Sequence, residues 1–275
     1  VKNLNKEITM EQKLTTQKLR ELVPAAFSYN PVVGVGANYT FVSTEKIIEN
    51  LEKLDWHPVV AKQDKSSDVR NSAFVKHMIR FRHGSMFDKS IVKNVGETIP
   101  EFVLINSHNR TFRFTLTFGL FRLVCSNGLV VHDELYTKIN TRHIGFDFDD
   151  LAETVDSYVE SFSLILEKID LYKNIMLNRA EKIEMAKKAA TLSWGKSVKV
   201  DIELLIKPKR DEDAGDSLWK VFNVIQENIT KGGITYITSS GNRKATTQPI
   251  TAVRRDFVFN QKFWMLMEAM RISKM

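Results

Sequence analysis

The residues best placed to do chemistry are basic side chains at alternate positions of a strand-like stretch. In AFVKHMIRFRH, which begins at Ala73, the cations Lys76, Arg80 and Arg82 alternate with apolar residues. Successive side chains of a strand point to opposite faces, so the three cations share one face within about 20 Å. Lys and Arg neutralise phosphates, and this face is a predicted nucleic-acid contact. The alternative is a solvated face that keeps the sheet soluble.

A second stretch, TFRFTLTFGL from Thr111, alternates in the same way. Its phenylalanines and Leu116 face one side, and Arg113 and three threonines face the other. The preceding SHNR, with Arg110 at its end, is typical of a hairpin turn. If both stretches belong to one sheet, their polar faces form a continuous basic, hydroxyl-rich surface. The alternation breaks near Gly119, which predicts a β-bulge.

Basic residues also gather near the C-terminus, in GNRKATTQPITAVRRD. The cations Arg243, Lys244, Arg254 and Arg255 lie there among Thr and Gln, with few acids. The prediction is a basic loop that clamps a nucleic-acid backbone, and the alternative is an ordinary surface loop. The formal net charge of +7 and the pI near 9.3 agree with a polyanionic partner and argue against an acidic DNA mimic.

Catalytic motifs are absent from the sequence. The six histidines form no HExxH, the one cysteine (Cys125) has no partner, and there is no Walker A or GxSxG motif. The densest acidic cluster, Asp147, Asp149 and Asp150, suits either a Mg²⁺-dependent nuclease or the start of a helix. We therefore assign no catalytic residue, metal or cofactor, and keep the nuclease as an alternative.

Composition predicts a folded protein of the cytoplasm. Hydrophobic residues make up 43% and charged residues 27% of the 275 residues, which is ordinary for a globular chain. A single cysteine suits a reducing compartment. No apolar run approaches the roughly 20 residues that a membrane-spanning helix needs, so no membrane partner is expected.

The periodicity predicts an α+β fold. Residues 44–55 have helical spacing behind an N-cap at Ser43, and the spacing then changes to period two. The expected strands are WHPVVAKQ, AFVKHMIRFRH, EFVLINS and TFRFTLTFGL, with a further candidate in TKINTRHIGF. They predict an antiparallel β-meander packed against a long helix from Asp149 to about Ala190. We expect a core domain over residues 1–205 and a C-terminal helix-loop-helix part over 206–275.

Three segments resemble one known family. They are FRLVCSNGLVV from Phe121, DSLWKVFNVIQENITKGG from Asp216 and the terminal FNQKFWMLMEAM. In this order they resemble the phage/plasmid-like family known as domain of unknown function 932 (DUF932). The resemblance implies work on the DNA of phages, prophages or plasmids, and it transfers no catalytic residue.

The layout of helix, meander and packing helix is also compatible with phage single-strand annealing proteins, which assemble into rings with DNA along a basic groove. The leading hypothesis is therefore a non-enzymatic, homo-oligomeric protein that binds or anneals single-stranded DNA in recombination or replication. One alternative is an interaction protein that acts against host defence or replication factors. The other is the metal-dependent nuclease.

Overall fold

The computed structural model describes residues 12–36, 39–68, 71–87, 98–122, 127–130, 153, 155, 162–196, 198–237 and 244–274. The chain divides into two compact units, Val1–Tyr158 and Val159–Met275. The predicted boundary at residues 205/206 lies inside the second unit. No helix in these described ranges combines the length and the apolar composition needed to cross a bilayer.

The first unit contains a five-stranded antiparallel sheet in the order β1-β2-β3-β4-β5. Each strand pairs with its neighbours in sequence, which confirms the predicted meander and the α+β class. The bounds are β1 Trp56–Gln63, β2 His77–His83, β3 Thr98–Asn106, β4 Thr115–Arg122 and β5 Asn127–Val130.

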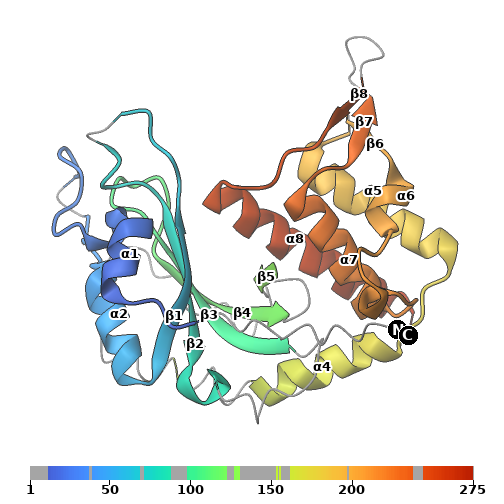
Figure 1. Cartoon of the computed structure of the whole chain (residues 1–275), viewed down its shortest axis with the longest axis horizontal. Coiled ribbons are helices and arrows are strands. Elements are labelled where there is room, and N and C mark those ends of the chain that lie inside the picture. The colour runs from blue at the N-terminus through green and yellow to red at the C-terminus, as the bar shows by residue number, and fades with distance from the viewer. Residues whose placement is uncertain are drawn as a thin grey trace, which may run out of the picture. The chain divides into compact units, whose positions relative to one another are not determined.

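Two helices lie beside one face of this sheet (Figure 1). They are α1 (Thr16–Leu22) and α2 (Thr44–Lys53), with the 3-10 turn η1 (Pro24–Phe27) directly after α1. The Ser43 hydroxyl accepts a hydrogen bond from the backbone N–H of Lys46, which confirms the predicted N-cap. The buried face of α2, including Ile47 and Leu51, closes the apolar core against the sheet.

A buried hydrogen-bond chain ties the start of α2 to the sheet. The Asn106 amide donates to Thr44 Oγ1 at 3.1 Å, and Thr44 Oγ1 lies 2.8 Å from His77 Nε2. His77 Nδ1 lies 3.0 Å from the carbonyl oxygen of Val75. A neutral imidazole with its proton on Nδ1 satisfies every contact in this chain, because Nε2 then accepts from the threonine hydroxyl. Burial lowers the pKa of His77 to about 4.

Two details of the predicted strands are wrong. The strand β4 begins at Thr115, because the chain through Thr111 still belongs to the bend that follows β3. Gly119 pairs in register with Glu101 and continues the ladder, so it forms no bulge. The one register shift given for β1–β4 falls in β1 between Pro58 and Val60, where proline has no N–H for the ladder.

The second unit is a group of helices with a three-stranded antiparallel sheet, β6-β7-β8, at one end (Figure 1). Its helices are α4 Phe162–Asn174, α5 Arg179–Trp194, α6 Ile202–Ile206, α7 Leu218–Lys231 and α8 Val253–Ile272, and η4 spans Asp211–Asp213. Its strands are β6 Lys199–Val200, β7 Thr235–Ile237 and β8 Lys244–Thr246. Aromatic rings of α7 and α8 stack in the core, with the ring centroids of Phe222 and Phe263 4.5 Å apart.

The predicted single helix to Ala190 is two helices. Asn178 starts α5 with a full capping box, in which its side chain accepts from Glu181 N–H and the Glu181 carboxylate accepts from Asn178 N–H. Between the helices, Met176 forms a β-bridge with Ser217. Apolar heptad spacing from Leu151 to Met176 predicted one continuous helix, but the cap and the bridge use backbone groups that a continuous helix would need.

Gly232 ends α7 at a φ of +66°, and its substitution gives a first testable expectation. A Cβ there would lie 2.6 Å from the carbonyl oxygen of Thr247. We expect Gly232→Ala to lower the free energy of unfolding by about 2–4 kcal/mol, from backbone strain plus this contact. Gly195→Ala is the matched control, since Gly195 also has a positive φ (+78°) but no atom within 4 Å of its Cβ position. If denaturant titrations show the same decrease in the free energy of unfolding for both variants, the contact with Thr247 contributes nothing to the loss.

Candidate nucleic-acid interface

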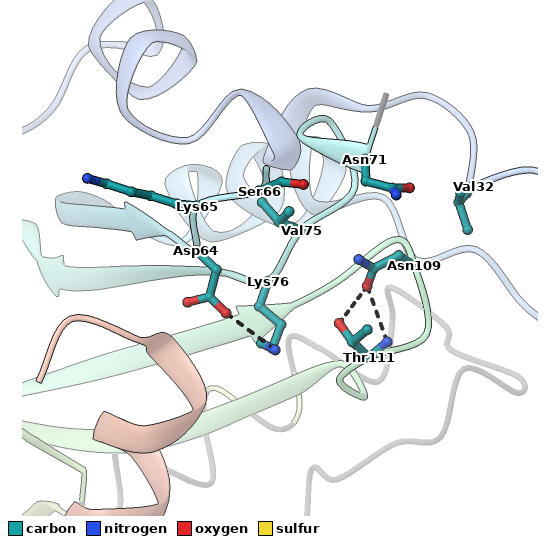
Figure 2. Close-up of a pocket in the computed structure, with 9 residues that line it drawn as sticks. All are labelled: Val32, Asp64, Lys65, Ser66, Asn71, Val75, Lys76, Asn109 and Thr111. Atoms are coloured by element: carbon teal, nitrogen blue, oxygen red, sulfur yellow. Dashed lines mark hydrogen bonds and ion pairs between the residues drawn. The ribbon is translucent and has the colours of Figure 1, made fainter. Parts of the chain in front are cut away.

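A polar cavity of about 420 Å³ lies at one end of the sheet in the first unit (Figure 2). Three chain segments line it: Val32 from the loop before α2, residues 64–76 from the β1–β2 connection, and the β3–β4 hairpin. Most of its wall consists of hydroxyl, amide and charged groups. Such a wall can form hydrogen bonds with a polar ligand and is less suited to a purely apolar one.

Backbone and side-chain hydrogen bonds hold the cavity wall in place. Asp64 N–H donates to the Lys76 carbonyl oxygen at 2.8 Å, and the Lys76 ammonium lies 3.3 Å from an Asp64 carboxylate oxygen (Figure 2). On the hairpin, Asn109 Oδ1 accepts from the N–H of Thr111 at 3.2 Å and from its hydroxyl at 2.5 Å. The predicted contact residue Lys76 therefore faces a cavity and is already paired with a carboxylate.

Arg110 occupies the tip of the hairpin in a left-handed conformation, with φ at +62°. Few residues other than Gly and Asn take this conformation without cost. The Arg110 side chain is exposed, and its positive charge opposes the rise that burial gives to the pKa of Tyr39. The guanidinium thus lies near the Tyr39 phenol, beside the cavity. The exposed Arg113 follows on the same hairpin.

Four predicted arginines differ from the rest in having no acidic partner. Among the residues described, Arg110, Arg113, Arg254 and Arg255 have no carboxylate within ion-pairing distance, and all four are exposed. Every other arginine whose side chain is described pairs with Asp or Glu: Arg20, Arg80, Arg82, Arg179, Arg210 and Arg271. Among the described residues, the four guanidiniums therefore have no carboxylate to leave before they donate to an external anion, and Arg255 also donates to the Ser193 carbonyl oxygen.

In the second unit, two lysines and an exposed isoleucine share one face of the small sheet. Lys199 pairs in register with Ile237, and Ile237 pairs with Lys244. Directly paired residues of antiparallel strands project to the same side, so the lysines flank Ile237. The Ile237 residue is 56% exposed. The sequence indicated Lys244 but not Lys199, because the sheet that joins them links segments about 40 residues apart.

The start of α8 lies against the end of α5. A guanidinium nitrogen of Arg255 donates to the Ser193 carbonyl oxygen at 3.3 Å. This contact places the Arg254–Arg255 pair near the exposed Lys196, which follows α5. The structure thus brings two predicted arginines beside a lysine that the sequence did not single out. Arg243 lies outside the described residues.

Arg80 and Arg82 were predicted as nucleic-acid contacts on an exposed strand face, and the structure instead buries both of them. Both pair with Glu101: Arg80 Nε lies 2.5 Å from Oε2, and Arg82 Nη2 lies 2.7 Å from Oε1. Phe81 pairs with Phe102 in register, so the three charged residues share the opposite face of β2 and β3. All three are at most 5% exposed, and Thr115 and Thr117 are buried on β4. The carboxylate on the neighbouring strand explains why the cations are internal.

Acidic clusters give no metal site in the part of the chain that is described. No group of three or more His, Cys, Asp or Glu side chains there is placed to hold a metal ion. The cluster Asp147, Asp149 and Asp150 lies outside the described residues, as does Cys125. The nuclease alternative therefore gains no observation in its favour.

Comparison with known proteins gives a family without an assigned reaction. The model of a domain of unknown function, DUF932, matches residues 32–258. The UPF0380 proteins YafZ and YfjQ of Escherichia coli (strain K12) are each 28% identical to this chain over 264 residues. The matches cover 96% of this chain and 93% of each relative. No solved structure matches.

Proposed function

The chain belongs to the DUF932 family, whose description assigns no activity, and from its geometry we propose that it binds single-stranded DNA. The observation that carries the proposal is the set of four exposed arginines that have no carboxylate partner in the described part of the chain, Arg110, Arg113, Arg254 and Arg255. A guanidinium presents a rigid fork of donors that matches phosphate oxygens. Two such sites, one in each unit, suit contact with a repeating phosphate backbone.

An exposed aromatic ring favours a single strand over a duplex. Tyr29 is 74% exposed, and the hydroxyl of the preceding Ser28 donates to the Ala73 carbonyl oxygen at 2.5 Å. Asn71 and Val75, on either side of Ala73, line the polar cavity, so Ser28 and Tyr29 belong to the same end of the first unit. Proteins that bind single strands combine basic surfaces with rings on which unpaired bases stack.

A salt titration tests the proposal. We expect labelled single-stranded DNA to bind at 50 mM salt and to dissociate steeply as salt rises, with a log–log slope near −0.7 per neutralised phosphate. The double variants Arg110→Ala/Arg113→Ala and Arg254→Ala/Arg255→Ala should each lower affinity by at least about tenfold. Each should also make the slope shallower by about 1.4, because two phosphate contacts are lost. Fluorescence anisotropy measures both quantities.

The chain offers controls that remove the same charge elsewhere. Lys46→Ala/Lys53→Ala removes two exposed cations from α2 in the first unit, and Lys207→Ala/Lys209→Ala does so in the second. These variants should change affinity by less than about threefold, since none of the four lysines is a predicted contact. Absence of binding by the unmodified protein at 50 mM salt overturns the proposal. Equal losses in the control and arginine variants would mean that only net charge matters.

The wider role in the proposal is annealing during recombination or replication of a phage or plasmid, by a homo-oligomer. It follows from the family resemblance and from the exposure of bases that backbone contacts permit. Light scattering with and without DNA measures assembly, and the pairing rate of complementary labelled strands measures annealing. A monomer that binds strands without accelerating their pairing would reduce the role to binding alone. Indifference to DNA together with a co-purifying host protein would favour the interaction-protein alternative.

A further inference from the structure

We propose that the 420 Å³ cavity of the first unit is a subsite for one nucleotide, with its phosphate held at the rim by Arg110 and Arg113. The inference deepens the proposed function and rests on it. It assigns to one end of the sheet a defined ligand, a nucleoside monophosphate or a single unit of a strand, rather than a general basic surface.

The size and the two kinds of wall fit such a ligand. Small-ligand sites are typically about 300–1,000 Å³, and this cavity falls in that range. Val32 and Val75 supply apolar surface for the flat side of a base or a sugar ring. Asn71, Asn109 and Thr111 supply amide and hydroxyl groups, which donate to and accept from the polar edge of a base (Figure 2).

The ion pair inside the cavity keeps capacity for a ligand. Lys76 has three N–H donors, and its ammonium lies 3.3 Å from one carboxylate oxygen of Asp64. The pair is neutral in sum, so the excess positive charge beside the cavity belongs to Lys65, which also lines it, and to the hairpin.

The hairpin supplies that charge at a place fixed by its turn. The two hydrogen bonds from Thr111 to Asn109 hold the left-handed residue Arg110 between them. Asn109 and Thr111 line the cavity, so the backbone of Arg110, which joins them, lies at its rim. Arg113 lies two residues further on, and neither arginine has an acidic partner among the described side chains. A phosphate at this rim would meet two unpaired guanidiniums.

Calorimetry with deoxythymidine monophosphate tests the inference on the full chain. Thymidine and inorganic phosphate are the partial probes, and each should bind at least about tenfold more weakly than the nucleotide, since each lacks half of the contacts. Thr111→Trp, at an exposed position, should fill the cavity and lower nucleotide affinity by about tenfold or more. Lys76→Met should do the same by removing a donor. Arg254→Ala/Arg255→Ala should leave nucleotide affinity within about twofold, because those residues lie in the other unit.

The outcomes separate this inference from the proposed function. If single-stranded DNA binds but the nucleotide does not, the subsite is overturned and strand binding stands. If the nucleotide binds and DNA does not, the subsite stands and the proposed function fails. Unchanged nucleotide affinity in a folded Thr111→Trp protein, with Asn71→Trp as the second cavity-filling variant, would also overturn the subsite. Equal affinity for inorganic phosphate and for the nucleotide would also overturn the subsite, because the base and the sugar would then contribute nothing to the affinity.

Discussion

Replacing Glu101 with glutamine is expected to lower the free energy of unfolding of the first unit by about 3–5 kcal/mol. The carboxylate is 1% exposed and is shared between Arg80 and Arg82. Glutamine keeps the shape but removes the charge, so two buried guanidiniums would lose their counterion. The loss of one partner from a buried pair costs much more than the pair contributes over an apolar replacement.

Hydrogen exchange of the β2 and β3 amides measures this effect in the unit where it occurs. Glu203→Gln is the matched control, because Glu203 pairs with Arg179 at a distance of 2.9 Å but both side chains are more than half exposed. Glu203→Gln should lower the free energy of unfolding by no more than about 0.5 kcal/mol. A loss below about 1 kcal/mol in Glu101→Gln would show that the two guanidiniums reach water or another counterion.

Replacing Arg80, Arg82 and Glu101 together by apolar residues gives a second test of the buried ion pairs. The triple variant Arg80→Met/Arg82→Met/Glu101→Leu should be markedly more stable than Glu101→Gln, since it leaves no buried charge without a partner. If Arg80 and Arg82 contribute no phosphate contact, as their burial indicates, this variant should also retain its affinity for single-stranded DNA. If the triple variant folds but no longer binds DNA, Arg80 and Arg82 do contribute contacts to DNA.

Lowering the pH from 7 to below 4 is expected to remove about 3 kcal/mol of stability through His77 alone. The pKa of this histidine falls from 6.5 to about 4 on folding, because burial disfavours the imidazolium. The folded state therefore binds fewer protons than the unfolded state between these values. The contribution of neutral His77 to the free energy of unfolding is fully present above pH 6.5 and is lost as the pH falls towards 4.

Denaturant titrations between pH 7 and pH 4 at constant ionic strength measure that slope. His77→Gln should be less stable than the unmodified protein at pH 7, because it disturbs the hydrogen bonds to Thr44 and Val75. Its stability should vary less with pH in this window, since the titrating group is gone. Parallel pH profiles for both proteins would contradict the assignment, because His77 would then have the same pKa folded and unfolded.

The strand order and the helices beside the sheet were predictable because their signals are local. Period-two alternation gave β1 residue for residue, and Ser43 with the apolar stripe gave α2. The break between α4 and α5 also had a local signal, since Asn178 and Glu181 have the spacing of a capping box. The apolar heptad spacing that runs to Met176 is the longer pattern of the two, and it predicted one continuous helix.

The interface was predictable in part. Among the arginines whose side chains are described, the sequence singled out the four that lack carboxylate partners, and it placed Arg110 in a turn. It could not separate them from Arg80 and Arg82, because every one of these residues alternates with apolar neighbours or lies in a basic run. The cavity was missed, since its wall joins residues from three segments between Val32 and Thr111 that are distant in sequence.

The sequence by itself determined the α+β class, the meander and the family. These follow from period, capping and composition, which act over a few residues. Tertiary structure alone decided which cations are available to a ligand. That choice depends on the register between β2 and β3, which places Glu101 beside Arg80 and Arg82 across a long connection. A one-residue slip would turn Glu101 to the other face, and no local pattern fixes pairing over that distance.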